Sequence, residues 1–234
     1  MALFWQEDDK QKEFVVPDDI LDVSLRLTGR AIPVDHAYAL SRAILAELPW
    51  MADEAAAGVH QIHVAASGNG WMRPEGGDGD ALIYMSRRTR LTLRVPKNRV
   101  PDCEALRGKV LNLNGHEVEV SGGVEIKPLS ALTTIFSRYV LAQSGESEDD
   151  FLHRIVATLA DERDIRVRKI LCGRETRFAA ADGPCSARSV MLAEIDKEES
   201  VRLQQHGLGA GRLMGFGLFI PHKGIAPVKG AADE

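Results

Sequence analysis

Apolar and polar residues alternate at the start of the chain in a way that predicts a strand followed directly by a helix. Over residues 20–28 every second side chain is apolar, which predicts a half-buried strand that ends at Gly29. Asp35 then stands where a helix N-cap is expected, and an apolar stripe at helical spacing predicts a helix over residues 37–48.

The rest of the first half continues this pattern. Residues 59–64 alternate like a strand, a glycine-rich link covers 68–79, and residues 81–95 predict a hairpin-like pair. A short helix is expected over 101–106, and a closing ribbon over 110–120 turns at Asn114–Gly115. Strand, helix, strand, strand, helix, strand is the order of a ferredoxin-like domain.

The second half predicts the same order again. Its expected elements are strands over 133–141, 167–171, 188–195 and 215–220, a helix capped by Ser147 and a helix over 198–206. The sequence therefore predicts an α+β fold of tandem ferredoxin-like βαββαβ domains with a C-terminal glycine-rich loop. The predicted divisions are a flexible arm at 1–18, domains at 19–122 and 123–224 that meet near Gly122–Gly123, and a tail at 225–234.

Composition narrows the class of protein. The chain has 234 residues, of which 44% are hydrophobic, and this is enough apolar material for a buried core. No apolar run approaches a membrane span and the acidic start does not resemble a signal peptide, so we expect a cytoplasmic protein with no membrane partner. The three cysteines have neither disulfide nor zinc spacing, so no metal and no cofactor is expected.

A glycine-rich segment over 206–224 leads into the last predicted strand. Its glycines, Gly207, Gly209 and Gly211 among them, permit positive φ and expose backbone N–H groups, so the loop is a candidate cradle for phosphate. Arg212 inside the loop can add a guanidinium to that grip. The alternative is that the glycines only permit tight turns. The spacing fits neither a Walker A loop nor a Rossmann fingerprint.

His36 is the first candidate for proton transfer. It follows the presumed cap Asp35 in the first turn of a helix, where free N–H groups attract an anion, and Tyr38 lies two residues on. The alternative is a surface or capping histidine. His60 and His63 are predicted to face opposite sides of a strand, so at most one of them points at a site.

Basic residues cluster on the hairpin of the first half. Arg87, Arg88, Arg90 and Arg94 form the densest group, and three of them share one face of alternating backbone, which suits an RNA backbone. The alternative is a solvated sheet face. The net charge of −5 argues against unselective binding of nucleic acid. A second basic strip in the other half consists of Arg163, Arg166, Arg168, Lys169, Arg174 and Arg177. Two basic strips and a glycine-rich loop in a metal-free chain indicate RNA recognised by shape and backbone.

Several motifs resemble one family. IPVDHAYAL, GVHQIHVAASGNG, SRRTRLTLRVP and ESVRLQQHGLGAGRLMGFGLFIPHKG are similar to segments of the CRISPR repeat-cleaving endoribonucleases, the sixth Cas family, in the version associated with the MYXAN subtype. The resemblance covers roughly residues 20–224 in the same order. It implies two ferredoxin-like domains of the RAMP class and metal-independent cleavage of CRISPR repeat RNA in a precursor transcript. The ribose 2′-hydroxyl would attack the adjacent phosphorus and leave a 2′,3′-cyclic phosphate and a 5′-hydroxyl.

The resemblance also implies roles for single residues. The DHAYAL match implies that His36 is the general acid or base and that Tyr38 orients the nucleophile or phosphate, with His60 or His222 as replacements because active sites in the family vary. Arg212 or Lys223 would hold the phosphorane charge. The implied partners are CRISPR repeat RNA, as precursor and mature guide, and other Cas subunits of an effector complex.

Two other functions remain open at this point. One is a non-catalytic RAMP subunit that binds and caps guide RNA in an interference complex. The other is an enzyme that acts on the phosphate of a small nucleotide and uses the glycine-rich loop to hold it.

Overall fold

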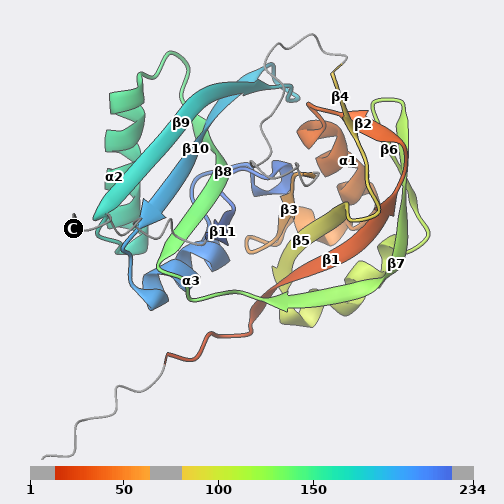
Figure 1. The fold of residues 1–234 in the computed structure, drawn as a ribbon, viewed down its shortest axis with the longest axis horizontal. Helices are drawn as coiled ribbons and strands as arrows, with labels where there is room; N and C mark the ends of the chain where they lie inside the picture. The colour runs from red at the N-terminus through yellow and green to blue at the C-terminus, as the bar shows by residue number, and fades with distance from the viewer. Residues whose placement is uncertain (1–13, 64–80, 223–234) are drawn as a thin grey trace, which may run out of the picture.

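The computed structural model describes residues 14–63 and 81–222, which form two larger antiparallel sheets and one small sheet (Figure 1). Residues 1–13 of the predicted arm, the predicted glycine-rich link and the predicted tail lie outside the described residues. Within the described ranges, no helix has the length and apolar character needed to cross a membrane.

The first sheet has the strand order β3-β5-β1-β7-β6. Its strands are β1 (Ile20–Thr28), β3 (Gly58–His60), β5 (Arg90–Pro96), β6 (Val110–Leu113) and β7 (His116–Pro128). β1 pairs with β5 on one side and β7 on the other, and β6 forms a hairpin with β7. This hairpin turns at Asn114 and Gly115, whose φ angles of 53° and 87° are both positive, as a tight two-residue turn requires. The predicted ribbon is therefore confirmed.

One α-helix covers the first sheet. α1 (Ala37–Glu47) comes directly after β2 (Ala31–Pro33), which pairs with β4 (Leu82–Tyr84) to form the small sheet. The helix buries Leu40 and Ile44 in the same core as Val23 and Leu25 of the first sheet. The second crossover contains only 3-10 turns, η2 (Lys97–Arg99) and η3 (Pro101–Leu106), where a short helix was predicted. α1 ends at Glu47, just before Pro49, which begins a further 3-10 turn, η1 (Pro49–Ala52).

The second sheet repeats the arrangement with the order β11-β8-β10-β9. Its elements are β8 (Thr134–Ala142), α2 (Glu148–Arg163), β9 (Lys169–Phe178), β10 (Cys185–Ala193), α3 (Lys197–His206), η4 (Arg212–Met214) and β11 (Phe219–Pro221). Ser147 caps α2 by accepting the amide of Asp150 at 3.2 Å, as predicted. In the second sheet the first strand, β8, lies between the third, β10, and the last, β11. In the first sheet β1 likewise lies between the third strand, β5, and the last, β7, so the tandem ferredoxin-like fold is confirmed.

Two predicted strands are shorter in the structure. β3 ends at His60, because the side chain of Gln61 donates to Met214 O and the amide of Ile62 donates to the ring of His36 instead of to a neighbouring strand. β11 begins only at Phe219, because Gly215 and Gly217 have φ angles of 85° and 64°, which a regular strand does not accept.

The predicted boundary at Gly122–Gly123 is wrong. Both residues lie inside β7, where the pairing with β1 shifts register between Ser24 and Arg26 and Gly122 has a φ of 78°. The glycine pair therefore forms a β-bulge. The connection between the two sheets is residues 129–133, between β7 and β8.

Candidate functional site

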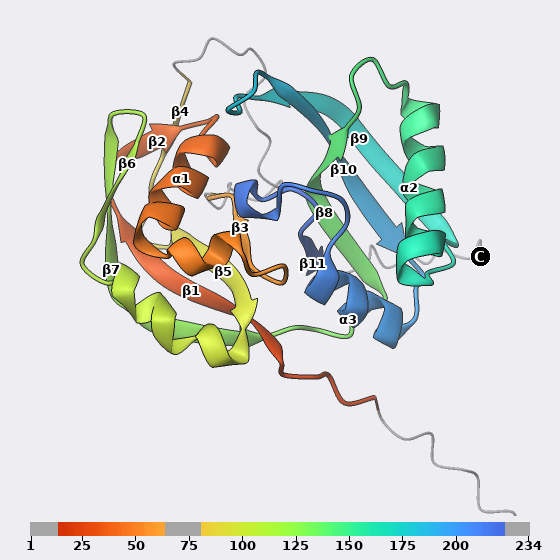
Figure 2. The ribbon, with the colours of Figure 1, turned by 180° about the vertical axis from the view of Figure 1, so that it is seen from behind.

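The glycine-rich loop lies between the two sheets, beside β3 and β8 (Figure 2). Close backbone approach explains two of its glycines. A Cβ atom on Gly217 would stand 2.0 Å from the carbonyl oxygen of Leu208, and one on Gly215 would stand 3.0 Å from the carbonyl oxygen of Val59. The amide of Gly217 also donates to Tyr139 O at 2.7 Å. These glycines let the loop join β3 of the first sheet to β8 of the second.

Among the three glycines of the predicted phosphate cradle, Gly209 at the tip of the loop is the exposed one. Gly207 is buried at the end of α3, and its amide donates to Leu203 O. The carbonyl of Gly211 accepts the amides of Met214 and Phe216 within the loop. Gly209 is exposed, and a Cβ atom there would meet no atom within 4 Å. Of the three glycines predicted to bind RNA, Gly209 is thus the exposed one.

Arg212 is engaged in holding the loop. Its Nε donates to Ala57 O at 3.1 Å, and its Nη2 donates to Ala56 O at 2.7 Å and Gln205 O at 2.9 Å. Burial, together with the positive charges of Arg94 and Arg163, lowers the pKa of Arg212 to about 10. These donors bind two carbonyls of the first domain and one of α3, so Arg212 has a structural role at the domain interface. The phosphate grip stays a prediction. Lys223 lies outside the described residues.

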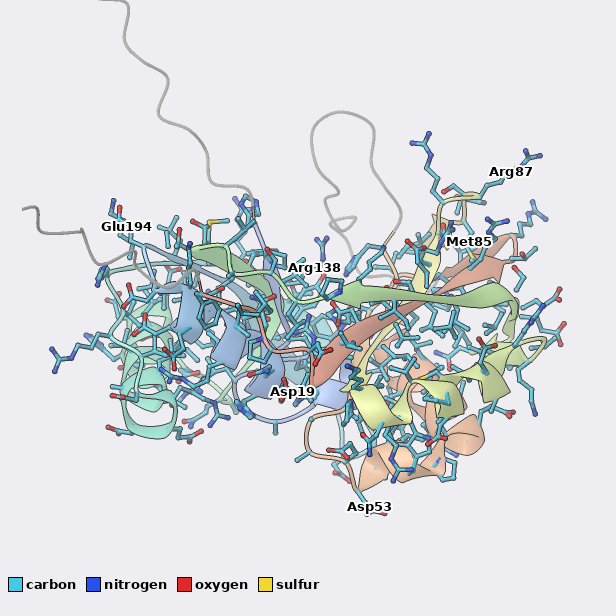
Figure 3. All side chains as sticks on the ribbon, turned by 90° about the horizontal axis from the view of Figure 1, so that it is seen from below. Asp19, Asp53, Met85, Arg87, Arg138 and Glu194 are labelled. Atoms are coloured by element: carbon cyan, nitrogen blue, oxygen red, sulfur yellow. The ribbon has the colours of Figure 1, made fainter. Side chains whose placement is uncertain are left out.

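The predicted basic row divides into exposed and buried members. Arg87 and Arg88 are exposed in the turn between β4 and β5, and Figure 3 shows Arg87 at the outer end of the first domain, away from Arg138. Arg90 is half-buried and donates to the carbonyls of Arg87 and Thr89. The prediction that Arg94 follows an RNA backbone is wrong, since its side chain is 0% exposed.

Arg94 instead joins the two domains. Its guanidinium binds the carboxylate of Asp22 with two hydrogen bonds of 2.8 and 3.0 Å, and its Nη1 donates to Gln204 O and Phe219 O in the second domain. Burial by itself would raise the pKa of Asp22, but Arg94 and His60 outweigh burial and hold that pKa well below its usual value. Asp22 is therefore ionised at neutral pH.

His36 and Tyr38 do not meet. His36 is 2% exposed, its Nδ1 lies 2.9 Å from Pro33 O, and its Nε2 accepts the amide of Ile62 at 2.9 Å. Nδ1 must carry the ring proton, because a carbonyl oxygen only accepts. Tyr38 lines a groove of about 520 Å³ between α1 and β6, where the guanidinium carbon of Arg42 lies 6.0 Å from its ring centre. Both nitrogens of His36 thus bind backbone in this structure.

A small cavity between the domains gathers titratable side chains instead. It has a volume of about 30 Å³, enough for a water molecule. The residues that line it are His60, Gln61, His63, Arg138, Tyr139, Gly215, Leu218 and Ile220. The prediction that His60 and His63 cannot serve one site is wrong, because β3 ends at His60 and the two-residue period ends with it. His222 is not among the lining residues, and its ring packs 6.2 Å from that of Phe136.

The electrostatics of His60 favour its neutral form. Burial lowers the pKa of His60, and the nearby Arg94 and Arg212 lower it further, whereas Asp22 raises it. The Nε2 atom of His60 stands 3.5 Å from Oδ1 of Asp22, which is at the long limit of a hydrogen bond. His60 can therefore accept a proton at neutral pH.

Arg138 is the cavity residue that the sequence did not single out. It lies on β8 between the two domains (Figure 3), and burial lowers its pKa. One signal was present, since Arg138 is a single cation in the otherwise uncharged strand Thr134–Ala142. Among residues 14–63 and 81–222, no three His, Cys, Asp or Glu side chains are grouped so as to hold a metal ion.

Two ferredoxin-like sheets joined through a glycine-rich loop define a RAMP-type protein. The fold is shared with the solved structures of a CRISPR-associated protein Cas6 (TM-score 0.56, 15% identity, 87% of this chain and 100% of that one) and of a RAMP protein that binds different RNA substrates (TM-score 0.59, 13% identity, 87% and 100%). A CRISPR-associated endonuclease Cas6 from Myxococcus xanthus (strain DK1622) is 24% identical over 204 residues, which are 86% of this chain and 81% of that protein. Residues 21–224 match the model of the family described as Cas6 Crispr. The chain therefore belongs to the Cas6 family.

Proposed function

We propose that this protein is an endoribonuclease that cleaves CRISPR repeat RNA in a precursor transcript, and that it cuts at the cavity between its domains. The observation that carries the proposal is the meeting of His60, His63, Arg138 and Tyr139 beside the glycine-rich loop in a member of the Cas6 family. The Myxococcus xanthus relative is named as an endonuclease, which supports the same class of reaction.

The side chains of the cavity suit a cleavage that uses the ribose of the RNA as nucleophile. A neutral imidazole of His60 takes the proton of the 2′-hydroxyl, and the 2′-oxygen attacks the adjacent phosphorus. The bond to the 5′-oxygen breaks, and that oxygen receives a proton from a second acid, which we assign to His63 in the cavity wall. The products are a 2′,3′-cyclic phosphate and a 5′-hydroxyl. The guanidinium of Arg138 stabilises the charge of the phosphorane.

His36 takes a different role in this proposal. The family resemblance implies proton transfer by His36, but its two ring nitrogens are bound to Pro33 O and the amide of Ile62. We assign to it the positioning of residues 61–63, which carry part of the cavity wall. Tyr38, which lies in the groove beside α1, is assigned no step at the cavity.

RNA contacts are proposed for the exposed members of the predicted set. Arg87 and Arg88 present guanidinium groups to solvent, and the tip of the glycine-rich loop exposes Gly209. Both features suit the phosphate backbone, since arginine supplies charge and glycine permits close approach.

One assay tests the proposed function. Purified protein and its cognate repeat RNA are incubated with a chelator, and the products are mapped and end-analysed. We expect a single cut at a fixed position with a 2′,3′-cyclic phosphate, and no cut when the nucleotide upstream of the cut is 2′-deoxy. A protein that binds the repeat tightly and leaves it intact would instead be a non-catalytic RAMP subunit, and cleavage that stops in chelator would contradict the metal-independent mechanism.

A further inference from the structure

Asp22 stands between a fully buried arginine and a cavity histidine. Arg94 grips both carboxylate oxygens of Asp22, at 2.8 and 3.0 Å. His60 approaches one of these oxygens from the cavity side, with Nε2 at 3.5 Å from Oδ1. The side chains of His60 and Asp22 are 16% and 17% exposed, so water competes little for this contact.

The nitrogen that faces Asp22 has no other partner. Nε2 of His60 is buried and has no hydrogen-bond partner within standard distance limits among the described residues. A buried N–H requires an acceptor, and the carboxylate oxygen of Asp22 is the one at hand. Apart from Asp22 on β1, the charged or titratable groups around His60 are Arg94 on β5, Arg212 on η4, and His63, Arg138 and Tyr139 in the cavity wall.

We propose that Asp22 is a positioning residue that holds His60 as the tautomer protonated on Nε2. Nδ1 is then unprotonated and can accept the proton of the 2′-hydroxyl in the cavity. The inference deepens the proposed function, because it rests on His60 as the base of the cleavage. The logic is that of a carboxylate that orients an imidazole and stabilises the imidazolium formed during the reaction.

The arrangement also links the cavity to the docking of the two domains. Arg94 is held by the carbonyls of Gln204 on α3 and Phe219 on β11, so the second domain fixes the arginine that fixes Asp22. Contacts made in the domain interface thereby determine the orientation of a side chain in the cavity. A change at either carbonyl is transmitted to His60 through two side chains.

The tautomer can be measured without any activity. Protein labelled with ¹⁵N-histidine is examined by long-range ¹H–¹⁵N correlation, with the His60 signals assigned by comparison with His60→Gln. We expect a protonated Nε2 and an unprotonated Nδ1 in the wild type, and loss of this preference in Asp22→Asn. A wild-type His60 protonated on Nδ1 overturns the proposal, and this result does not depend on whether Asp22→Asn folds.

Cleavage supplies a second readout. Single-turnover rates on repeat RNA are measured from about pH 5 to about pH 9, the range in which a histidine titrates. In Asp22→Asn we expect the maximal rate to fall about 10²-fold or more, which begins at the lower end of the effect of a lost general base or its orienting group. The acid limb should move to lower pH, because the carboxylate that favours the imidazolium is gone. Binding of RNA that is 2′-deoxy at the cut should be unchanged.

Two further variants make the result specific. Asp22→Glu keeps the charge opposite Arg94 and should restore part of the rate. Gln205→Ala removes another contact between the domains, from Gln205 Nε2 to Asp19 Oδ1 at 2.7 Å, and should leave the pH profile in place. If the wild type does not cut repeat RNA, the proposed function fails while the tautomer still tests Asp22. If the wild type cuts and Asp22→Asn behaves like Gln205→Ala, only the role of Asp22 fails.

Discussion

The ring of His36 accepts the amide of Ile62 at 2.9 Å and thereby ties the first turn of α1 to the segment that follows β3. The other ring nitrogen is 2.9 Å from Pro33 O, so one buried side chain joins two stretches of backbone. Residues 61–63 leave the sheet at this point and form part of the cavity wall. The position of a backbone segment at the cavity therefore depends on a histidine that is not in the cavity.

Replacing His36 should lower stability and cleavage together. His36→Ala leaves the buried amide of Ile62 without an acceptor, which costs about 1–3 kcal/mol. We expect a lower urea midpoint, faster hydrogen exchange at residues 61–63 and slower cleavage with an unchanged pH profile. A stable His36→Ala protein that keeps this segment protected and loses one limb of the pH–rate profile would instead assign proton transfer to His36.

Removing the cavity histidines should stop cleavage and spare binding. For His60→Ala and for His63→Ala we expect rates about 10²–10⁴-fold below wild type, the usual effect of losing a general acid or base. Affinity for repeat RNA, measured with a 2′-deoxy substrate, should stay near the wild-type value. The matched control is His153→Ala, an exposed histidine on α2, which should cut normally. Normal cutting by both cavity variants would exclude this cavity as the active site.

Acid should destabilise the fold through His60. The pKa of His60 is lowered from 6.5 in the folded protein, mainly by burial, so the unfolded chain binds the proton more readily. The contribution of His60 to stability is therefore complete above about pH 6.5 and is lost as the pH falls through the folded pKa. We expect urea unfolding at several pH values to show that the free energy of unfolding falls less steeply with acid in His60→Gln than in the wild type. His206, whose pKa is also lowered, is compared through His206→Gln. Equal slopes in wild type and His60→Gln would contradict a buried neutral His60.

Breaking the ion pair of Arg94 and Asp22 should strongly destabilise the folded protein. Arg94→Met leaves the carboxylate of Asp22 buried without its counter-charge, and such a loss costs about 3–5 kcal/mol. The double variant Arg94→Met with Asp22→Leu removes both charges and should recover much of the stability. Thermal unfolding of the three proteins measures this. A single variant as stable as the wild type would show that the pair does not stabilise the domain interface.

Positions in the glycine-rich loop should respond differently to alanine. Gly217→Ala places a Cβ atom 2.0 Å from Leu208 O, so the backbone of the loop must shift away from Leu208. The Cβ atom of Gly209→Ala meets no atom within 4 Å. We expect a loss of stability for Gly217→Ala well beyond the roughly 1–2 kcal/mol of a non-glycine residue at positive φ, and only that smaller loss for Gly209→Ala. Chemical unfolding measures both. Similar losses in the two variants would contradict the packing described for Gly217.

Arg87 and Arg88 should contribute to RNA binding through charge. Each arginine that contacts a phosphate of a single strand adds about 0.7 to the slope of log affinity against log salt. Arg87→Ala and Arg88→Ala should therefore weaken binding at low salt and reduce this slope, with no change in unfolding. Arg107→Ala, an exposed arginine outside the predicted set, serves as the control. Slopes equal to the wild type would remove both residues from the RNA interface.

Local pattern was enough to predict the fold, because strand and helix periods and caps are properties of neighbouring residues. Ser147 and Asn114–Gly115 mark a helix start and a turn as predicted, and the tandem ferredoxin-like order follows from such signals. The prediction that Asp35 caps α1 is wrong, because the N-cap is His36 and the carboxylate of Asp35 accepts the amide of Ala179 in the second domain at 2.7 Å. Alternation failed where a distant partner overrode it. Gln61 and Ile62 bind residues far away in the sequence, and this ends β3 early.

The candidate site was harder to predict from the sequence than the fold, because the role of a side chain depends on the residues that surround it in the folded protein. The alternating pattern predicts that Arg88 and Arg94 lie on the same face of a strand. In the structure, however, Arg94 is buried among groups of both domains and Arg88 is exposed. The sequence by itself determined two ferredoxin-like units and a glycine-rich connection between α3 and β11. The tertiary structure alone decided which histidines share a cavity and which arginines face solvent, since both depend on how the two sheets dock.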